Sequence, residues 1–152
     1  MANLKIEIPL AAAANDVNTL IREFYDPEVT PPQLVNAASR SFLFLRDDQN
    51  QIRGGAYMEF IFDICSINGI WVSADLRGQG HGVRIYQAIE DLAFIKGRKR
   101  VVLSAFEFQN SIRFWEKMGF TKFAELPGYP EGSRLFYMHK AVTDRPFSTA
   151  NK

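Results

Sequence analysis

The sequence predicts a single α/β domain whose sheet is partly antiparallel and partly parallel. Three observations predict this fold class. A length of 152 residues fits one hydrophobic core. A composition of 47% hydrophobic and 23% charged residues is typical of a globular protein and argues against a disordered one. Three strand-like segments in succession are followed by alternating helical and strand-like segments. We expect one domain over residues 1–142 and a flexible tail over residues 143–152.

Strands are predicted where apolar and polar residues alternate, or where a short apolar run lies between turn residues. Seven segments meet this description: residues 4–8, 41–46, 52–62, 64–73, 100–106, 120–126 and 134–141. The polar turn from Asp47 to Asn50 joins the second and third of these segments and predicts a hairpin. A sheet of six to seven strands is therefore expected.

Helices are predicted where apolar residues recur every three to four positions. About four helices are expected, at residues 11–24, 33–39, 80–96 and 110–118. Pro27 and the pair Pro31-Pro32 end the first helix and frame a loop that is a candidate rim for a substrate. Gly97 and Gly119 follow the last two helices, where a glycine commonly ends a helix.

Cysteine content, charge and hydropathy exclude several kinds of site and partner. Cys65 is the sole cysteine, which excludes an intramolecular disulfide and a cysteine-based zinc site. The two histidines are far apart in the sequence, so no metal is expected. A net charge of +1 gives no reason to expect nucleic acid as a partner. Because no apolar run approaches the ~20 residues that span a membrane and no leader pattern is present, we expect a cytoplasmic enzyme without membrane contacts.

The segment from Arg77 to Gly82 predicts a binding site for a phosphate group. It connects an apolar strand, residues 67–72, to the helix that begins near Gly80. Glycines allow a tight turn and close approach of the backbone, so that successive N–H groups and the helix N-terminus converge on phosphate oxygens. His81 and Arg84 are additional candidate donors.

Two other phosphate loops do not fit this segment. A dinucleotide-binding loop needs a third glycine where this chain has Val83. A P-loop needs lysine and then serine or threonine after its last glycine, but Val83 and Arg84 follow Gly82. A flexible glycine turn without a ligand is the structural alternative.

The same segment resembles the hallmark of the GNAT acetyltransferases, Arg/Gln-x-x-Gly-x-Gly/Ala, with Arg77, Gly80 and Gly82 at the defining positions. A second segment, from Phe114 to Phe120, is similar to the family's aromatic-rich "fYeklGF" motif, and the likeness extends over about residues 52–142. The resemblance implies a mostly antiparallel sheet, splayed between the strands at residues 64–73 and 100–106, with acetyl-CoA in the gap. The residues it implies for coenzyme binding are Ile70, Trp71, Val72, Arg77, Gly78, Gln79, Gly80, His81, Gly82, Val83, Asn110 and Phe114. A helix N-cap is the alternative role for Asn110, and a core position is the alternative for Phe114.

The resemblance also implies the chemistry, in which an uncharged amine attacks the thioester directly. A backbone N–H near Trp71 or Val72 would stabilise the oxyanion. Glu59 and Glu107 are candidate bases for the amine, and an ordinary solvated carboxylate is the alternative for each. This chain has Trp115 where the family often has the tyrosine that protonates the leaving thiolate, and tryptophan cannot act as an acid. Water, or another group such as Tyr129 or Tyr137, could take that role.

A further departure from the family lies just before the helix at residues 110–118. Phe108 occupies the place of a frequent asparagine, and Gln109 and Asn110 are possible replacements.

The function that the resemblance implies is acetylation of a primary amine on a small molecule or a peptide. The loop from Pro127 to Gly132 and the residues around Tyr25 border the acceptor side in the family. A catalytically silent acetyl-CoA-binding module is the first alternative, because Trp115 replaces tyrosine. A nucleotide-binding regulatory domain is the second. The apolar stretch from Leu135 to Met138 could serve core packing or a subunit interface, so a homodimer is an open alternative.

Overall fold

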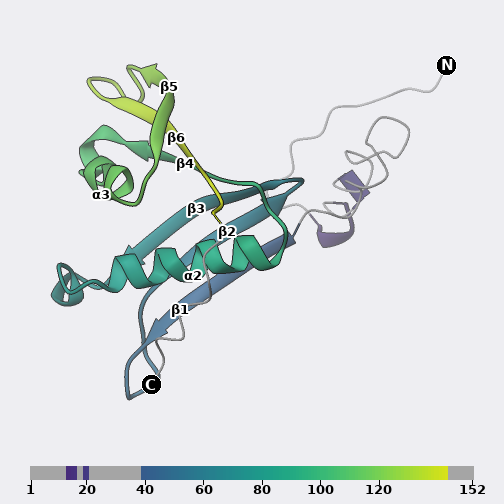
Figure 1. Ribbon diagram of the computed structural model, residues 1–152, viewed down its shortest axis with the longest axis vertical. Helices are drawn as coiled ribbons and strands as arrows, with labels where there is room; N and C mark the ends of the chain where they lie inside the picture. The colour runs from purple at the N-terminus through teal and green to yellow at the C-terminus, as the bar shows by residue number, and fades with distance from the viewer. Residues whose placement is uncertain (1–12, 17–18, 21–38, 144–152) are drawn as a thin grey trace. The chain divides into compact units, whose positions relative to one another are not determined.

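The computed structural model describes residues 13–16, 19–20 and 39–143 of the chain (Figure 1). The chain divides into two units, residues 1–37 and 38–152, and the six strands found among the described residues belong to the second. In the first unit, residues 14–16 and 19–20 are helical, as the helix predicted at 11–24 requires. The predicted strand at 4–8, the loop around Tyr25 and nearly all of the predicted helix at 33–39 lie outside the described residues.

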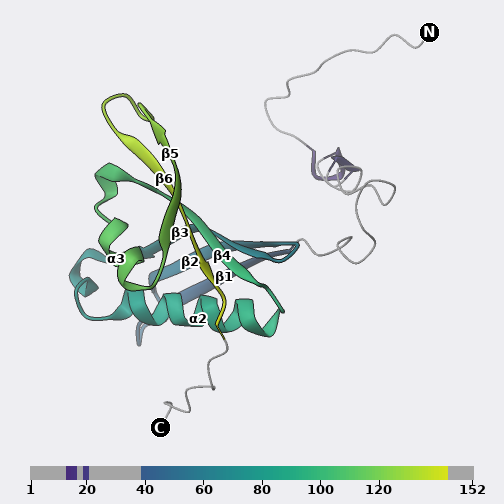
Figure 2. The same ribbon diagram turned by 45° about the horizontal axis from the view of Figure 1, so that its top comes forward.

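The second unit is a mixed, mostly antiparallel sheet, as predicted. Its strands are β1 (Ser39–Arg46), β2 (Ile52–Ile61), β3 (Ile64–Val72), β4 (Arg100–Phe106), β5 (Thr121–Pro127) and β6 (Arg134–Ala141). They lie side by side in the order β1-β2-β3-β4-β6-β5 (Figure 2). Every neighbouring pair is antiparallel except β3 and β4, which are parallel.

The first three strands form the predicted meander. Its first turn is closed by Asp47, whose Oδ1 accepts hydrogen bonds from the backbone N–H groups of Gln49 and Gln51 at 3.0 and 2.9 Å. Along β2 the side chains alternate, and Ala56, Met58 and Phe60 are buried on one face. Helix α2 (His81–Ile95) crosses that face of the sheet (Figures 1 and 2). The core is therefore the layer between α2 and the sheet.

Helix α2 begins and ends where the glycines predict. Its N-cap is Gly80, in the left-handed conformation with φ 85°. After the C-cap at Lys96, Gly97 also has a positive φ, 68°, as is usual for the residue that stops a helix. The apolar stripe of α2 buries Ile85 and Ile89 against the sheet.

The helix predicted at residues 110–118 is shorter in the structure. A 3₁₀ turn, η2 (Glu107–Gln109), precedes it, and α3 itself spans Ile112–Lys117. Asn110 ends the 3₁₀ turn with φ 54°, and the N-cap of α3 is Ser111. The alternative that Asn110 caps the helix is therefore wrong, because a left-handed residue between two turns cannot take that place.

Cys65 lies in the core, fully buried in β3. Burial raises the pKa of its thiol to about 12, because a thiolate there would lose its hydration. We expect Cys65 in the native protein to be unreactive toward iodoacetamide at pH 8, and to react fully once the chain is unfolded in guanidinium. Mass spectrometry of the alkylated protein checks this, and rapid native labelling would contradict the burial of β3.

Candidate functional site

Strands β3 and β4 pair along only part of their length and then separate. The pairing runs from Ile64 with Arg100 to Ile67 with Leu103, although β3 continues to Val72. On its other edge, β3 carries a bulge at the point of separation: Tyr57 of β2 lies opposite Gly69 and Met58 lies opposite Ile67, so Asn68 is the extra residue. A bulge bends the strand that contains it. The last five residues of β3 therefore diverge from β4.

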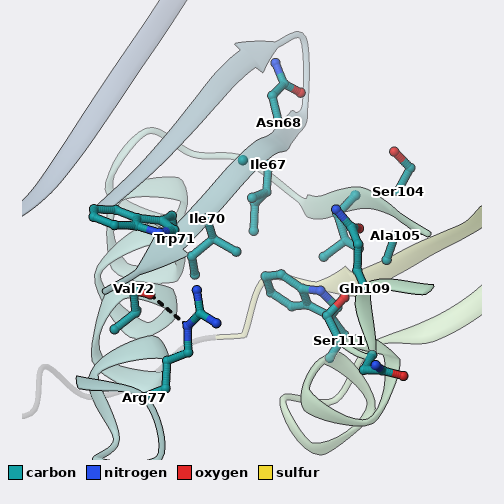
Figure 3. A pocket seen from close by; sticks show the side chains of 14 residues that line it. Ile67, Asn68, Ile70, Trp71, Val72, Arg77, Ser104, Ala105, Gln109 and Ser111 are labelled. Atoms are coloured by element: carbon teal, nitrogen blue, oxygen red, sulfur yellow. Dashed lines mark hydrogen bonds between the residues drawn. The ribbon is translucent and has the colours of Figure 1, made fainter. Parts of the chain in front are cut away.

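A pocket of about 510 Å³ fills the gap between the separated strands. One wall comes from β3 and the loop after it, and the opposite wall comes from β4, η2 and α3 (Figure 3). The lining residues are Ile67, Asn68, Gly69, Ile70, Trp71, Val72, Arg77, Leu103, Ser104, Ala105, Gln109, Asn110, Ser111 and Trp115. Of the predicted coenzyme-binding residues, five line this pocket: Ile70, Trp71, Val72, Arg77 and Asn110.

The glycine loop, which is the segment from Arg77 to Gly82, leads from the pocket into the start of α2. A short 3₁₀ turn, η1 (Ala74–Leu76), leads from β3 into it. Gly78 and Gly80 have φ values of 74° and 85°, and a Cβ on either would meet no atom within 4 Å. No atom therefore blocks the approach of a ligand to the backbone at these two glycines, and exposed backbone N–H groups before a helix suit a phosphate group.

Arg77 connects the loop to the pocket. Its Nε donates a hydrogen bond to the carbonyl oxygen of Val72 at 3.0 Å, which ties the loop to the end of β3 (Figure 3). Gln79 bonds within the loop, through Nε2 to the carbonyl oxygen of Asp75 at 2.8 Å. One turn into α2, the guanidinium of Arg84 lies 3.4 Å from Nδ1 of His81.

The remaining predicted coenzyme-binding residues surround the first turn of α2. Gly82 is the second residue of the helix, and Val83 follows it. A Cβ placed on Gly82 would lie 3.5 Å from Cε2 of Phe114, at ordinary contact distance. Phe114 of α3 is thus adjacent to the glycine loop and also packs against the core.

Glu59, a predicted base, lies on β2 outside the pocket lining. It accepts hydrogen bonds from the hydroxyl of Tyr57 at 2.9 Å and from Nε of Arg40 at 3.0 Å. The hydrogen bond from Tyr57 is the main cause that lowers the pKa of Glu59, and Asn68 and Arg40 contribute in the same direction. A lowered pKa makes the carboxylate a weaker base. Through Asn68, however, Glu59 is linked to the pocket wall.

Glu107 and Tyr129, the other predicted catalytic residues, also lie outside the lining. The carboxylate of Glu107 is paired with Arg134 of β6, with 2.6 Å between Oε1 and Nη2. That pairing lowers the pKa of Glu107. Tyr129 is half exposed, and its ring lies 5.8 Å from that of Phe106 at the end of β4. The structure thus brings neither group into the pocket.

Trp115 has a structural role that its position in the sequence does not reveal. Its side chain is 3% exposed and makes edge contacts with the rings of Phe114, Tyr86 and Phe120. One part of the indole also lines the pocket. The residue in the tyrosine position of the family motif is therefore a core aromatic with one edge toward the candidate site.

Sequence analysis missed three polar residues of the lining: Asn68, Ser104 and Ser111. Asn68 could have been found, because Asn68-Gly69 interrupts an otherwise apolar strand and such an interruption can indicate a bulge. Ser104 is likewise the one polar residue between the apolar Val101 and Phe106. Ser111 carries no such signal, because a serine is common at the start of a helix such as the one predicted at 110–118.

Two negative findings apply to the described part of the chain. Residues 13–16, 19–20 and 39–143 contain no group of three or more histidine, cysteine, aspartate or glutamate side chains placed to hold a metal ion. Within these same ranges, no helix has the length and apolar character needed to cross a membrane.

Comparison with known proteins identifies the fold. An acetyltransferase from Bacillus cereus ATCC 14579 is 20% identical, with a TM-score of 0.74 over 90% of this chain and 98% of the other. An acetyltransferase described as putative from Agrobacterium tumefaciens is 18% identical, with a TM-score of 0.73 over 91% and 99% of the two chains. An aminoglycoside 6'-N-acetyltransferase complexed with coenzyme A is 15% identical, with a TM-score of 0.60 over 87% and 92%. No curated protein sequence matches the chain.

The fold and the match to a family model together define a GNAT-type N-acetyltransferase. The model of the acetyltransferase (GNAT) family matches residues 13–120, which is most of the chain, so the protein belongs to this family. The family uses acetyl-CoA as its acyl donor. The prediction that followed from Arg77, Gly80 and Gly82 is thereby confirmed at the level of the family.

Proposed function

We propose that this protein transfers the acetyl group of acetyl-CoA to a primary amine of a small molecule or a peptide, by direct attack of the amine on the thioester. The observation that carries the proposal is the pocket between the separated halves of β3 and β4, which adjoins the open glycine loop through Arg77. One continuous site can thus hold a pyrophosphate at the loop and an extended thioester arm along β3.

Backbone groups of this chain can bind both the pyrophosphate of acetyl-CoA and its pantetheine arm. Backbone N–H groups from Gly78 to Val83 would bind the pyrophosphate, aided by the positive end of α2. The edge of β3 from Asn68 to Val72 has no strand partner on the β4 side among the described strands, so its backbone can pair with the amides of the pantetheine arm. A backbone N–H in this stretch would also stabilise the oxyanion.

Gln109 can donate a hydrogen bond to the pantetheine arm from the wall opposite β3. Its Oε1 accepts a hydrogen bond from the backbone N–H of Phe106 at 3.1 Å, which sets the orientation of the amide group. The Nε2 group remains as a donor in a residue that lines the pocket. We assign Gln109 the position that the family's asparagine often takes, because Phe108 is 59% exposed and lies outside the lining.

The pocket favours an uncharged amine. Arg77 is the one charged side chain among its described lining residues, and the candidate carboxylates Glu59 and Glu107 lie outside it. A cationic amine would lose hydration there and would meet a positive guanidinium, and both effects lower its pKa. Deprotonation can then proceed through water, so positioning supplies much of the acceleration.

A catalytically silent module that binds acetyl-CoA is the second candidate, and Trp115 is the observation that favours it. The side chain of Trp115 is buried against the ring of Tyr86, and its indole group is not an acid that could protonate the leaving thiolate. An enzyme and a silent module share every feature of the glycine loop, so only turnover distinguishes them.

The test is thiol release by the full chain with acetyl-CoA and a panel of primary amines and short peptides, beside a calorimetric titration with acetyl-CoA. We expect binding and amine-dependent release of coenzyme A. Binding without release for every amine in the panel would favour the silent module. The absence of binding would contradict both candidates.

A further inference from the structure

The leaving thiolate needs a proton, and neither Trp115 nor the predicted tyrosines can deliver it from where they lie. Tyr129 and Tyr137 are outside the pocket lining. Among the described lining residues, two side chains carry a hydroxyl group, Ser104 and Ser111. The choice of proton donor within the lining is therefore between these two serines.

Ser111 lies near Trp115, the residue in the position of the family's tyrosine. It lies one helical turn before Trp115, whose backbone N–H donates a hydrogen bond to the carbonyl oxygen of Ser111 at 3.1 Å. Residues four apart lie on the same face of a helix, and both of these line the pocket. Ser111 and Trp115 thus lie on the same side of α3, at the wall of the pocket.

The hydroxyl of Ser111 is not used to cap the helix. Ser111 is the N-cap of α3, a position where serine usually accepts a hydrogen bond from a backbone N–H of the first turn. Here the side chain makes no such bond, and the residue is half-buried. A hydroxyl that the helix leaves free, at the wall of the pocket, can serve another partner.

Ser104 is less suited to the thiol. It directly follows Leu103, the last residue of β4 that pairs with β3, so it lies at the closed end of the gap. Ser111 lies on the wall opposite β3, three residues before Phe114, and the ring of Phe114 is at contact distance from a Cβ placed on Gly82. An arm that enters from the glycine loop passes Ser111 before it reaches the closed end.

We propose that Ser111 relays a proton from the attacking amine to the departing sulfur. This role rests on the acetyl transfer proposed above. As the new C–N bond forms, the amine nitrogen becomes a strongly acidic ammonium group. When the C–S bond breaks, the hydroxyl of Ser111 gives its proton to sulfur and Oγ accepts the ammonium proton. The amide and the thiol leave uncharged, and the serine is regenerated without a further reactant.

In a relay, the serine hydroxyl does not need to be a strong acid. An isolated hydroxyl would not protonate a thiolate, because the alkoxide is far more basic. In a relay the oxygen gains one proton as it loses another, so no alkoxide forms. General acid–base assistance of this kind contributes about 10²–10⁴-fold to a rate.

The experiment compares Ser111→Ala, Ser111→Thr and Ser104→Ala in the full chain. We expect Ser111→Ala to lower kcat about 100-fold, at the lower end of that range, with an unchanged dissociation constant for acetyl-CoA. Ser111→Thr retains a hydroxyl and should recover a large part of kcat. Because the hydroxyl makes no capping bond, the thermal unfolding midpoint of Ser111→Ala should match that of the natural protein.

A second measurement separates proton transfer from a merely structural role. The relay moves two protons in one step, so the proton inventory of kcat with acetyl-CoA in mixtures of H2O and D2O should be curved for the natural protein and linear for Ser111→Ala. A curved inventory that persists in Ser111→Ala, or a loss of kcat that appears in Ser104→Ala instead, would overturn the role of Ser111. Full activity of Ser111→Ala would do the same while leaving acetyl transfer intact. No turnover by the natural protein would overturn acetyl transfer and the relay together.

Discussion

Replacing Gly82 by aspartate is expected to weaken acetyl-CoA binding at least about 100-fold while the protein stays folded. Gly82 is the second residue of α2 and its side-chain direction is open apart from ordinary contact with Phe114. A carboxylate there would occupy the space of a pyrophosphate oxygen and repel its charge. A 100-fold loss corresponds to about 2.8 kcal/mol of binding free energy, since each tenfold change is about 1.4 kcal/mol.

The same substitution should not harm the fold. Gly82 has a helical backbone, unlike Gly78 and Gly80 with their positive φ values, so a side chain causes no backbone strain. An acidic residue in the first turn of a helix is favourable toward the macrodipole. Calorimetric titration measures the affinity, and thermal unfolding verifies the fold.

Two further variants isolate the cause of the lost affinity. Gly97→Asp places the same side chain at the opposite end of α2, at a positive φ and with no atom within 4 Å, and should bind acetyl-CoA normally. Gly82→Asn keeps the bulk of aspartate without the charge and should lie between the natural protein and Gly82→Asp. Normal binding by Gly82→Asp would exclude the glycine loop as the pyrophosphate site.

The elements with local sequence signals were predictable, and the glycine loop was the most informative of them. The bounds of β4 and β6 agree with the predicted strands, and α2 begins within one residue of the prediction. Each of these elements has its own periodicity and a glycine, a turn or a polar loop at its ends. The loop could be located for the same reason, because glycines at a strand-to-helix junction are visible without knowledge of the fold.

Features that depend on distant contacts were not predictable from the residues alone. The separation of β3 from β4 followed only from the family resemblance, since it arises where the bulge at Asn68 meets the end of a parallel pairing. The short α3 reflects Asn110, whose φ of 54° separates the 3₁₀ turn at Glu107–Gln109 from the helix that follows Ser111. The side chain of Gln109 closes that turn by bonding to the N–H of Phe106. Glu107 pairs with Arg134, which is 27 positions away in the sequence. The sequence does not reveal this pairing, so Glu107 was predicted as a candidate base.

The largest loss of stability is expected for Lys140→Met. Glu90 of α2 is 1% exposed, and its Oε1 lies 2.9 Å from Nζ of Lys140 on β6, whose side chain is 15% exposed. Lys140 Nζ also lies 5.2 Å from the ring centre of Tyr86. Removing the ammonium group would break a buried ion pair from one side, which typically costs about 3–5 kcal/mol. A domain of this size has about 5–15 kcal/mol of stability in total, so the effect is a large fraction of it.

The double variant Glu90→Leu/Lys140→Met distinguishes the lost charge pair from lost packing. Replacing both partners by apolar side chains of similar size removes the uncompensated charge, so most of the stability should return. Urea unfolding of the three proteins measures the free energies. If Lys140→Met loses less than about 1 kcal/mol, the pair behaves like an exposed one and does not hold α2 against the sheet. If the double variant is as unstable as the single one, the loss comes from the aliphatic chain of Lys140, which packs beside Gly119, and not from its charge.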